Sequence, residues 1–157
     1  RGLLSDPGLE ETRGSVECPV FDSQEAGVSA ALVLAPRFGI VALSEQAIPR
    51  HRRRLARSGA LPRLAREVGL SGVCARAAGH DPAVCPDLLA AGRAVVRAGA
   101  GAVVLGCGGF GPWRLALQRE LRVPVTDPVL AAAGIALAVS ERGVAAVSRA
   151  ARGSGHG

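Results

Sequence analysis

Short apolar runs alternate with longer mixed segments along this chain, and the two kinds of segment predict different elements. The run at residues 101–105, Gly-Ala-Val-Val-Leu, has the length and composition of a buried parallel strand. Weaker strand patterns occur at residues 19–21, 38–43, 73–77 and 123–125. Amphipathic or small-residue segments predict helices at residues 25–34, 45–58, 61–68, 86–98, 112–121 and 127–141.

The order of these elements predicts an α/β fold. Strands and helices alternate with short connections, which favours a parallel sheet with flanking helices on both faces. The length of 157 residues fits one ordinary domain with a sizeable core, and a second α/β unit is expected to begin near Pro36. Asp127 followed by Pro128 predicts the capped start of the last helix.

The strongest candidate for chemistry is Cys107, which directly follows the strand at residues 101–105. A turn of glycines surrounds it, and an amphipathic segment begins at Pro112. This pattern places a thiol at the carboxyl edge of the sheet, where α/β proteins bind ligands, and opposite the amino end of a helix, which favours a thiolate. The glycines Gly106, Gly108 and Gly109 let backbone N–H groups approach a carboxylate, imide or enolate oxygen. The alternatives are a buried filler cysteine and a tight turn.

Composition narrows the function classes. Hydrophobic residues make up 48% of the chain, yet no apolar run approaches the ~20 residues of a membrane span. We expect no signal peptide, and a cytoplasmic location is the default expectation. The chain contains no methionine and opens at Arg1, which leads us to expect a fragment or the remainder of a longer protein.

The net charge is +6, and residues 50–54 form the basic cluster Arg-His-Arg-Arg-Arg. Both features are compatible with nucleic-acid binding. The favoured interpretation is a solvated helix face, with Ile48 and Leu55 turned inward. Aromatic residues make up only 3% of the chain and are scattered, so no stacking platform is predicted and no nucleic-acid partner is expected.

The spacing of the cysteines and histidines does not match a metal-binding motif. The four cysteines include no Cys-x-x-Cys pair, so no metal is predicted, and disulfides are not expected in a cytoplasmic chain. Cys74 and Cys85 are interpreted as structural, and His51 and His80 as surface residues.

Five stretches together resemble the aspartate/glutamate/hydantoin racemase superfamily, and most of all its hydantoin racemase branch, with allantoin racemases nearby. Two of them, Leu-Gly-Cys-Gly-Gly at residues 105–109 and Val-Pro-Val-Thr-Asp-Pro at 123–128, are fairly specific as a pair. The others are Asp-Pro-Gly-Leu at 6–9, Pro-Val at 19–20 followed by Glu25, and Arg-Phe-Gly-Ile-Val at 37–41. The resemblance covers nearly the whole chain.

The resemblance implies two α/β lobes with the active site between them and no cofactor. In this family two cysteines flank the α-carbon of a small-molecule substrate, one removing a proton and the other delivering one to the opposite face, as inversion through a planar intermediate requires. Cys107 would be the catalytic cysteine of the second lobe. Glu25 and Asp6 would join the three glycines in binding substrate, although Glu25 also fits a plain helix start and Asp6 a plain turn.

The same resemblance divides the chain into three parts. Residues 1–35 would be a remnant of the first lobe, 36–126 the second lobe, and 127–157 a helix returning toward the first lobe with a flexible tail. The position of the family's first cysteine corresponds to Leu3, so one half of the two-base site is missing. A homo-oligomer is left open.

Three interpretations follow from the missing cysteine. The chain is a truncated racemase that acts on a 5-substituted hydantoin or a similar compound, a one-cysteine relative of the arylmalonate decarboxylase type, or a non-catalytic member of the family. We favour the first interpretation, a truncated racemase.

Overall fold

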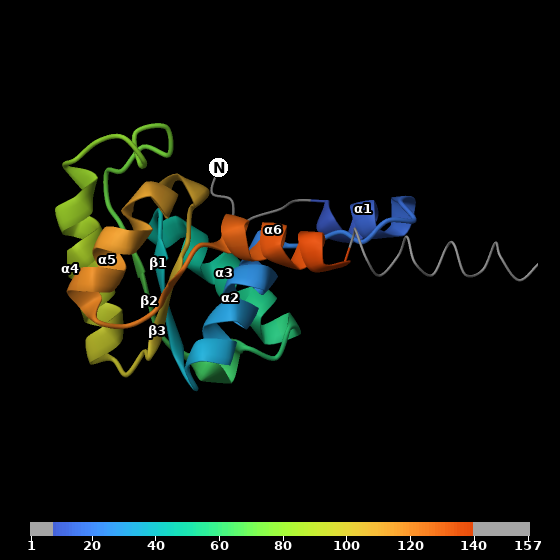
Figure 1. The fold of residues 1–157 in the computed structure, drawn as a ribbon, viewed down its shortest axis with the longest axis horizontal. Coiled ribbons are helices and arrows are strands. Elements are labelled where there is room, and N and C mark those ends of the chain that lie inside the picture. Colours follow the sequence, from blue (N-terminus) through green and yellow to red (C-terminus); the bar gives the residue numbers. More distant parts are fainter. Residues whose placement is uncertain (1–7, 140–157) are drawn as a thin grey trace, which may run out of the picture.

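Four parallel strands form the single sheet of the computed structural model, which describes residues 8–139 (Figure 1). The strands are β1 (Phe38–Ala42), β2 (Leu64–Gly69), β3 (Ala102–Leu105) and β4 (Val125–Thr126), in the order β2-β1-β3-β4. Their shared direction brings all carboxyl ends to one edge. The predicted α/β fold with a parallel sheet is confirmed.

The two central strands are buried over their whole length. Every residue of β1 and β3 is buried, which explains why both appear in the sequence as continuous apolar runs. Phe38 pairs with Ala102 and Val41 with Leu105, so the strands end side by side. The turn after β3 therefore lies beside the end of β1.

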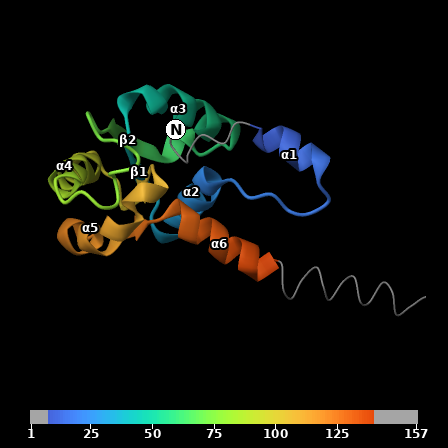
Figure 2. The same cartoon turned by 90° about the horizontal axis from the view of Figure 1, so that it is seen from above.

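Helices cover both faces of the sheet, as Figure 2 shows from above. On one face lie α4 (Val84–Arg97) and α5 (Arg114–Leu121), which build one apolar cluster with the sheet. On the other face lie α2 (Ser23–Leu34) and α3 (Ile48–Arg57), which build a second cluster. The sheet separates these two cores.

Two further helices lie outside this three-layer arrangement. The last described helix, α6 (Pro128–Val139), packs along α2, and Gly27 provides the close approach, because a Cβ there would lie 3.0 Å from the Cα of Pro128. The short α1 (Leu9–Ser15) lies beyond it, away from the sheet (Figure 1). Asp127 caps α6 as predicted, because its Oδ1 accepts from the N–H of Val129 at 2.8 Å. The predicted end of that helix, near residue 141, lies outside the described residues.

The prediction of a helix at residues 61–68 is wrong. The segment contains the short 3₁₀ helix η2 (Leu61–Arg63) and then the edge strand β2. Leucine, alanine, arginine and glutamate are good helix formers, but hydrogen-bonded pairing with the edge of β1 that β3 leaves open overrides that weak local preference.

Two weak strand predictions are also wrong. Residues 73–77 belong to a turn-rich loop, and residues 19–21 lie in no helix and in no strand of the described sheet. Both patterns were only three to five residues long, and neither has a neighbouring strand to pair with.

Helix starts differ from expectation by a turn. The predicted helix at 45–58 begins with the 3₁₀ helix η1 (Glu45–Ala47) before α3, and the predicted helix at 112–121 begins with η3 (Gly108–Trp113) before α5. Four arginines of α3 are exposed while Leu55 is buried, which fits the solvated-face interpretation. Among residues 8–139, no helix has both the length and the apolar character needed to cross a bilayer.

Candidate active site

The turn after β3 brings Gly106 against the end of β1. The N–H of Gly106 donates to the carbonyl oxygen of Val41 at 2.7 Å. A Cβ on Gly106 would lie 2.6 Å from that oxygen and 2.7 Å from the Cα of Ala42. Only glycine fits here, so close packing of two strand ends is sufficient to explain this residue.

Cys107 follows with its side chain on the α4–α5 face of the sheet. The residue is 4% exposed and belongs to the apolar cluster on that face, together with Leu105 and Phe110. Cys107 stands at the amino end of η3, and its carbonyl oxygen accepts from the N–H of Phe110 at 3.0 Å. The expected helix amino end is therefore that of a 3₁₀ helix, and α5 begins only at Arg114.

A loop between β2 and α4 packs over the Cys107 turn. Ala78 is fully buried, and its carbonyl oxygen accepts from Nε1–H of Trp113 at 2.7 Å. A Cβ on Gly109 would lie 3.1 Å from the Cβ of Ala78 and 3.5 Å from Sγ of Cys107. The glycine thus lets the loop and the thiol approach the same point.

Cys74 lies on this loop and is exposed, so it is not a thiol that fills the core. The backbone N–H of Arg76, followed by the N–H of Ala77 and the charge of Arg76, lowers the pKa of the Cys74 thiol from its ordinary value. A lower pKa leaves more of the reactive thiolate at neutral pH.

We expect Cys74 to be alkylated by iodoacetamide faster at pH 7 than a cysteine in an unstructured peptide. Its rate should rise with pH about a midpoint below that of the cysteine in the peptide, and the advantage should vanish where both thiols are fully ionised. Peptide mass spectrometry separates this rate from those of exposed Cys18 and buried Cys107. A midpoint at or above that of the peptide would contradict the expectation.

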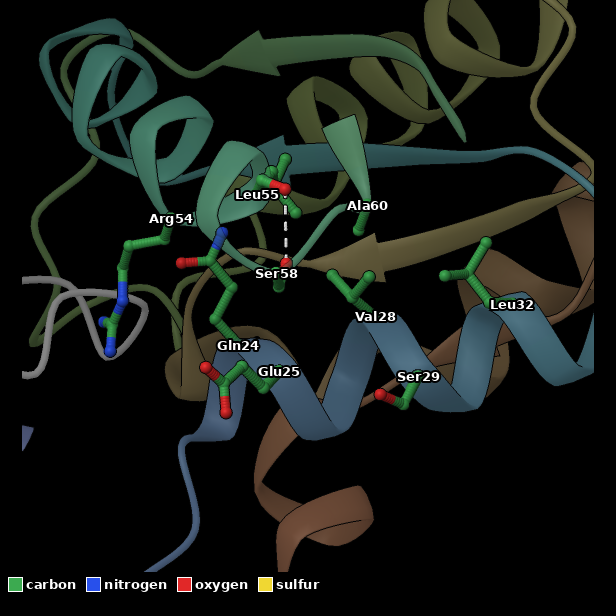
Figure 3. A pocket seen from close by; sticks show the side chains of 9 residues that line it. All are labelled: Gln24, Glu25, Val28, Ser29, Leu32, Arg54, Leu55, Ser58 and Ala60. Carbon is green, nitrogen blue, oxygen red and sulfur yellow. Dashed lines mark hydrogen bonds between the residues drawn. The ribbon is translucent and has the colours of Figure 1, made fainter. Parts of the chain in front are cut away.

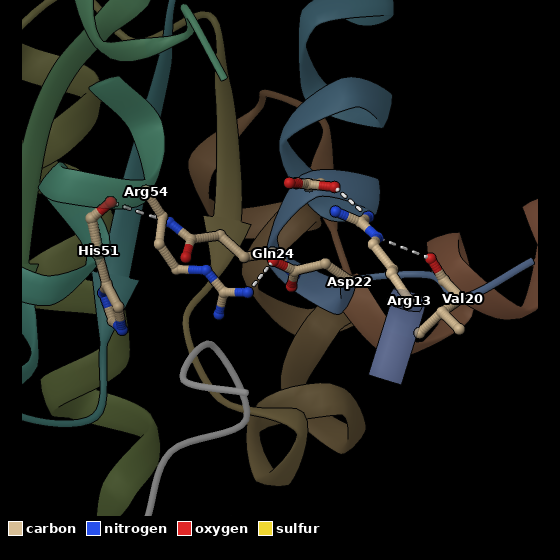
Figure 4. Close-up of polar contacts among 7 residues, drawn as sticks. Arg13, Val20, Asp22, Gln24, His51 and Arg54 are labelled. Carbon is tan, nitrogen blue, oxygen red and sulfur yellow. Dashed lines mark hydrogen bonds and ion pairs between the residues drawn. The ribbon is translucent and has the colours of Figure 1, made fainter. Parts of the chain in front are cut away.

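A second group of polar side chains lies on the opposite face of the sheet, near α2 and α3 (Figure 4). Asp22 caps α2 by accepting from the N–H of Gln24 at 2.8 Å, and it forms an ion pair with Arg54. Nε2–H of Gln24 donates to the carbonyl oxygen of His51 at 3.3 Å. These contacts tie the start of α2 to α3.

His51 is buried, so its interpretation as a surface residue is wrong. Its Nδ1 lies 2.5 Å from Oε1 of Glu67, and both side chains are only 1% exposed. Sequence reasoning missed this pair. The signal was the helical spacing that puts His51 four residues before buried Leu55, on the inward side of α3.

A groove of about 360 Å³ lies between α2 and α3 (Figure 3). Glu25 borders it and forms an ion pair with Arg13 at 3.0 Å, with the two side chains 43% and 36% exposed. Gln24 and Arg54 border the same end, and Val28, Leu32 and Leu55 line the rest.

The structure therefore divides the predicted site residues between two places. Gly106, Cys107, Gly108 and Gly109 form one turn at the carboxyl edge of the sheet. Glu25 lies in the groove on the other face, and no hydrogen bond or ion pair joins it to Cys107 within the described part of the chain. Asp6 lies outside the described residues, and residues 8–139 hold no cluster of three metal-ligating side chains.

Comparison with known proteins identifies similar sequences. A family model described as Asp/Glu/Hydantoin racemase matches residues 4–136. A hydantoin racemase of Paenarthrobacter aurescens is 35% identical over 136 residues, which are 85% of this chain and 57% of that protein. A hydantoin racemase of Rhizobium meliloti is 31% identical over 90% of this chain and 59% of that protein.

Solved structures of racemases and of a decarboxylase have a similar fold. Allantoin racemase from Pseudomonas fluorescens superimposes with a TM-score of 0.78 at 28% identity, over 85% of this chain and 57% of that one. Arylmalonate decarboxylase, at 18% identity and a TM-score of 0.57, shares the fold. The chain thus spans a little over half the length of the relatives it matches.

Proposed function

This chain belongs to the Asp/Glu/hydantoin racemase family, and from that premise we propose that its Cys107 thiol transfers a proton at the α-carbon of a small carbonyl compound such as a 5-substituted hydantoin. The observation that carries the proposal is the position of Cys107, in a glycine turn at the carboxyl edge of a parallel sheet. Ligands of open α/β folds bind at this edge.

The chemistry needs a base and a place for the negative charge. A thiolate of Cys107 would take the α-proton, and the electron pair left on carbon would move onto the neighbouring carbonyl oxygen as an enolate. Backbone N–H groups of Gly108 and Gly109 are the proposed donors to that oxygen. No cofactor is required for these steps.

Stereochemistry depends on a second acid. If the Cys107 thiol returns the proton to the same face, the substrate exchanges its α-hydrogen without inversion. Racemisation needs a donor on the opposite face, and the family's first cysteine corresponds to Leu3 of this chain. Proton exchange, rather than loss of optical activity, is therefore the direct readout of the Cys107 role.

We expect this chain to exchange the α-proton of 5-benzylhydantoin for deuterium in heavy water, as followed by proton NMR on each enantiomer. Cys107→Ser should reduce exchange to the rate without protein, because a hydroxyl is a far weaker base than a thiolate at neutral pH. Cys85→Ser is the matched control, since Cys85 is a partly buried thiol on α4 outside the turn.

Exchange of one enantiomer alone would indicate a one-base site, and exchange of both with racemisation would mean that another group supplies the second proton. Equal exchange by the wild-type chain and Cys107→Ser would overturn the proposed role. Carbon dioxide release from a disubstituted malonate would instead support the one-cysteine decarboxylase. The division of the chain at residues 36 and 127 stays a prediction, and a homo-oligomeric state stays open.

A further inference from the structure

We propose that two copies of this chain associate through α6, and that the dimer shares one site to which each copy contributes its Cys107 thiol. The inference rests on the proposed function, because it takes Cys107 as a group that transfers protons. It adds the second acid that racemisation requires, which is the same thiol of the second copy.

One side of α6 is apolar and uncovered. Leu130, Ala133 and Leu137 follow one another at intervals of three and four residues, which places them in one row along the helix. All three are exposed, Leu130 by 61% and Leu137 by 64%. Pro128, on the opposite side of the helix, is buried against α2. A row of exposed leucines on a helix that packs by its other side is typical of a protein interface.

Charge identifies a second copy as the partner that fits this surface. The chain carries a net charge of +6, and α6 is the one α-helix within residues 8–139 that contains no charged residue. Two copies therefore meet along α6 without bringing arginines together, whereas contact through the exposed arginines of α3 would oppose like charges. An acidic partner would be attracted to those arginines rather than to α6.

The uncovered helix begins beside the Cys107 turn. Asp127 caps α6, and its Oδ2 lies against Gly111, because a Cβ on Gly111 would be 2.7 Å from that oxygen. Gly111 belongs to η3, the 3₁₀ helix that follows Cys107. Since α6 directly follows β4, which runs parallel to β3, it leaves the sheet at the edge where β3 ends (Figure 1). A partner on α6 therefore lies next to the edge that carries the thiol.

A twofold dimer through this surface supplies the second acid. In such a dimer the same surface meets itself, so an interface that includes α6 brings the adjoining Cys107 edges of both copies together. The thiolate of one Cys107 takes the α-proton of the substrate, and the electron pair moves onto the carbonyl oxygen. As the carbonyl re-forms, the thiol of the second Cys107 gives its proton to the opposite face of the carbon. The first Cys107 ends as the thiol and the second as the thiolate, so the dimer is ready for the other enantiomer.

Sedimentation velocity tests the interface without any measurement of activity. We expect the wild-type chain to be a dimer at micromolar concentration and Leu137→Arg to be a monomer, because the added arginines of two copies would repel each other. Leu137 is exposed in the single chain, so its replacement should leave the circular dichroism spectrum unchanged. Val33→Arg is the matched control and should stay a dimer, since Val33 is 85% exposed on α2, outside α6.

A mixing experiment tests the shared site. Wild-type and Cys107→Ser chains are combined in equal amounts in urea and refolded together, and racemisation of 5-benzylhydantoin is followed by polarimetry. Random pairing leaves roughly one quarter of the dimers with both thiols, so the rate should fall to about a quarter of that of refolded wild type at the same total concentration. Independent sites, one in each chain, would retain about half of the rate and would overturn the shared site.

The Leu137→Arg monomer should lose racemisation but still exchange the α-proton for deuterium, because it keeps one thiol. A wild-type chain that is monomeric at every concentration tested, or a Leu137→Arg variant that stays a dimer or racemises at the wild-type rate, would overturn the proposal. A dimer that exchanges no hydantoin proton would refute the Cys107 role, and the shared site with it. A wild-type monomer that exchanges the proton would keep the Cys107 role and refute the dimer.

Discussion

Replacing Gly106 by alanine is expected to lower the free energy of unfolding by about 3 kcal/mol, near the top of the ~1–3 kcal/mol range for overpacked sites. The added Cβ would meet the carbonyl oxygen of Val41 at 2.6 Å and the Cα of Ala42 at 2.7 Å. Both are backbone atoms of a central strand, so neither can move aside as a flexible side chain would. Relief requires the turn to shift, which stretches the bond from Gly106 N–H to Val41.

Urea unfolding monitored by circular dichroism measures this change, with Gly134→Ala as the matched control. Gly134 lies within α6 and nothing lies within 4 Å of the position of its Cβ. Alanine there should be neutral or stabilise the helix by up to about 1 kcal/mol. If Gly106→Ala were as stable as Gly134→Ala, the close approach of the turn to β1 would be wrong.

The sequence was sufficient for features whose causes are local. The strand before Cys107 is a continuous apolar run because it is buried on both faces, and the start of α6 is marked by a cap residue and a proline. Both signals lie within a few neighbouring residues. The glycines of the Cys107 turn were also visible, although the sequence could not show that Gly106 is fixed by contact with β1.

Features with distant causes were missed. Residues 64–69 form a strand only because β1 offers an unpaired edge, and nothing in that segment records the edge. Cys74 is exposed because its segment is a loop rather than the predicted strand. The burial of His51 depends on Glu67, sixteen residues further along and in a segment expected to be helical. Because residues 61–68 were predicted as a helix rather than a strand, the contact between His51 and Glu67 was not predicted.

The second large effect is expected from substitutions in the pair His51–Glu67, which should lower the free energy of unfolding. Glu67→Ala should destabilise the fold by about 3 kcal/mol, because it leaves Nδ1 of His51 buried without its partner 2.5 Å away, and one-sided removal of a buried pair costs ~3–5 kcal/mol. His51→Leu should cost a similar amount by stranding the carboxylate, which is 1% exposed. Glu67→Gln keeps an oxygen that accepts from the ring and is expected to cost less, about 1 kcal/mol.

The double variant His51→Leu/Glu67→Leu tests whether the pair contributes net stability to the fold. Since desolvation of two buried polar groups offsets most of their attraction, apolar residues of similar volume should restore stability to within about 1 kcal/mol of the wild type. A double-mutant cycle in urea, with His51→Leu and Glu67→Leu as the single changes, then gives a coupling energy whose size is close to the sum of the two single costs. Additive losses in the double variant would contradict direct pairing, and would mean that each side chain is held by other contacts. If the double variant regains the stability of the wild type, the paired side chains contribute no net free energy of folding. Loss of stability would then arise only when one of the two buried polar groups is left without its partner.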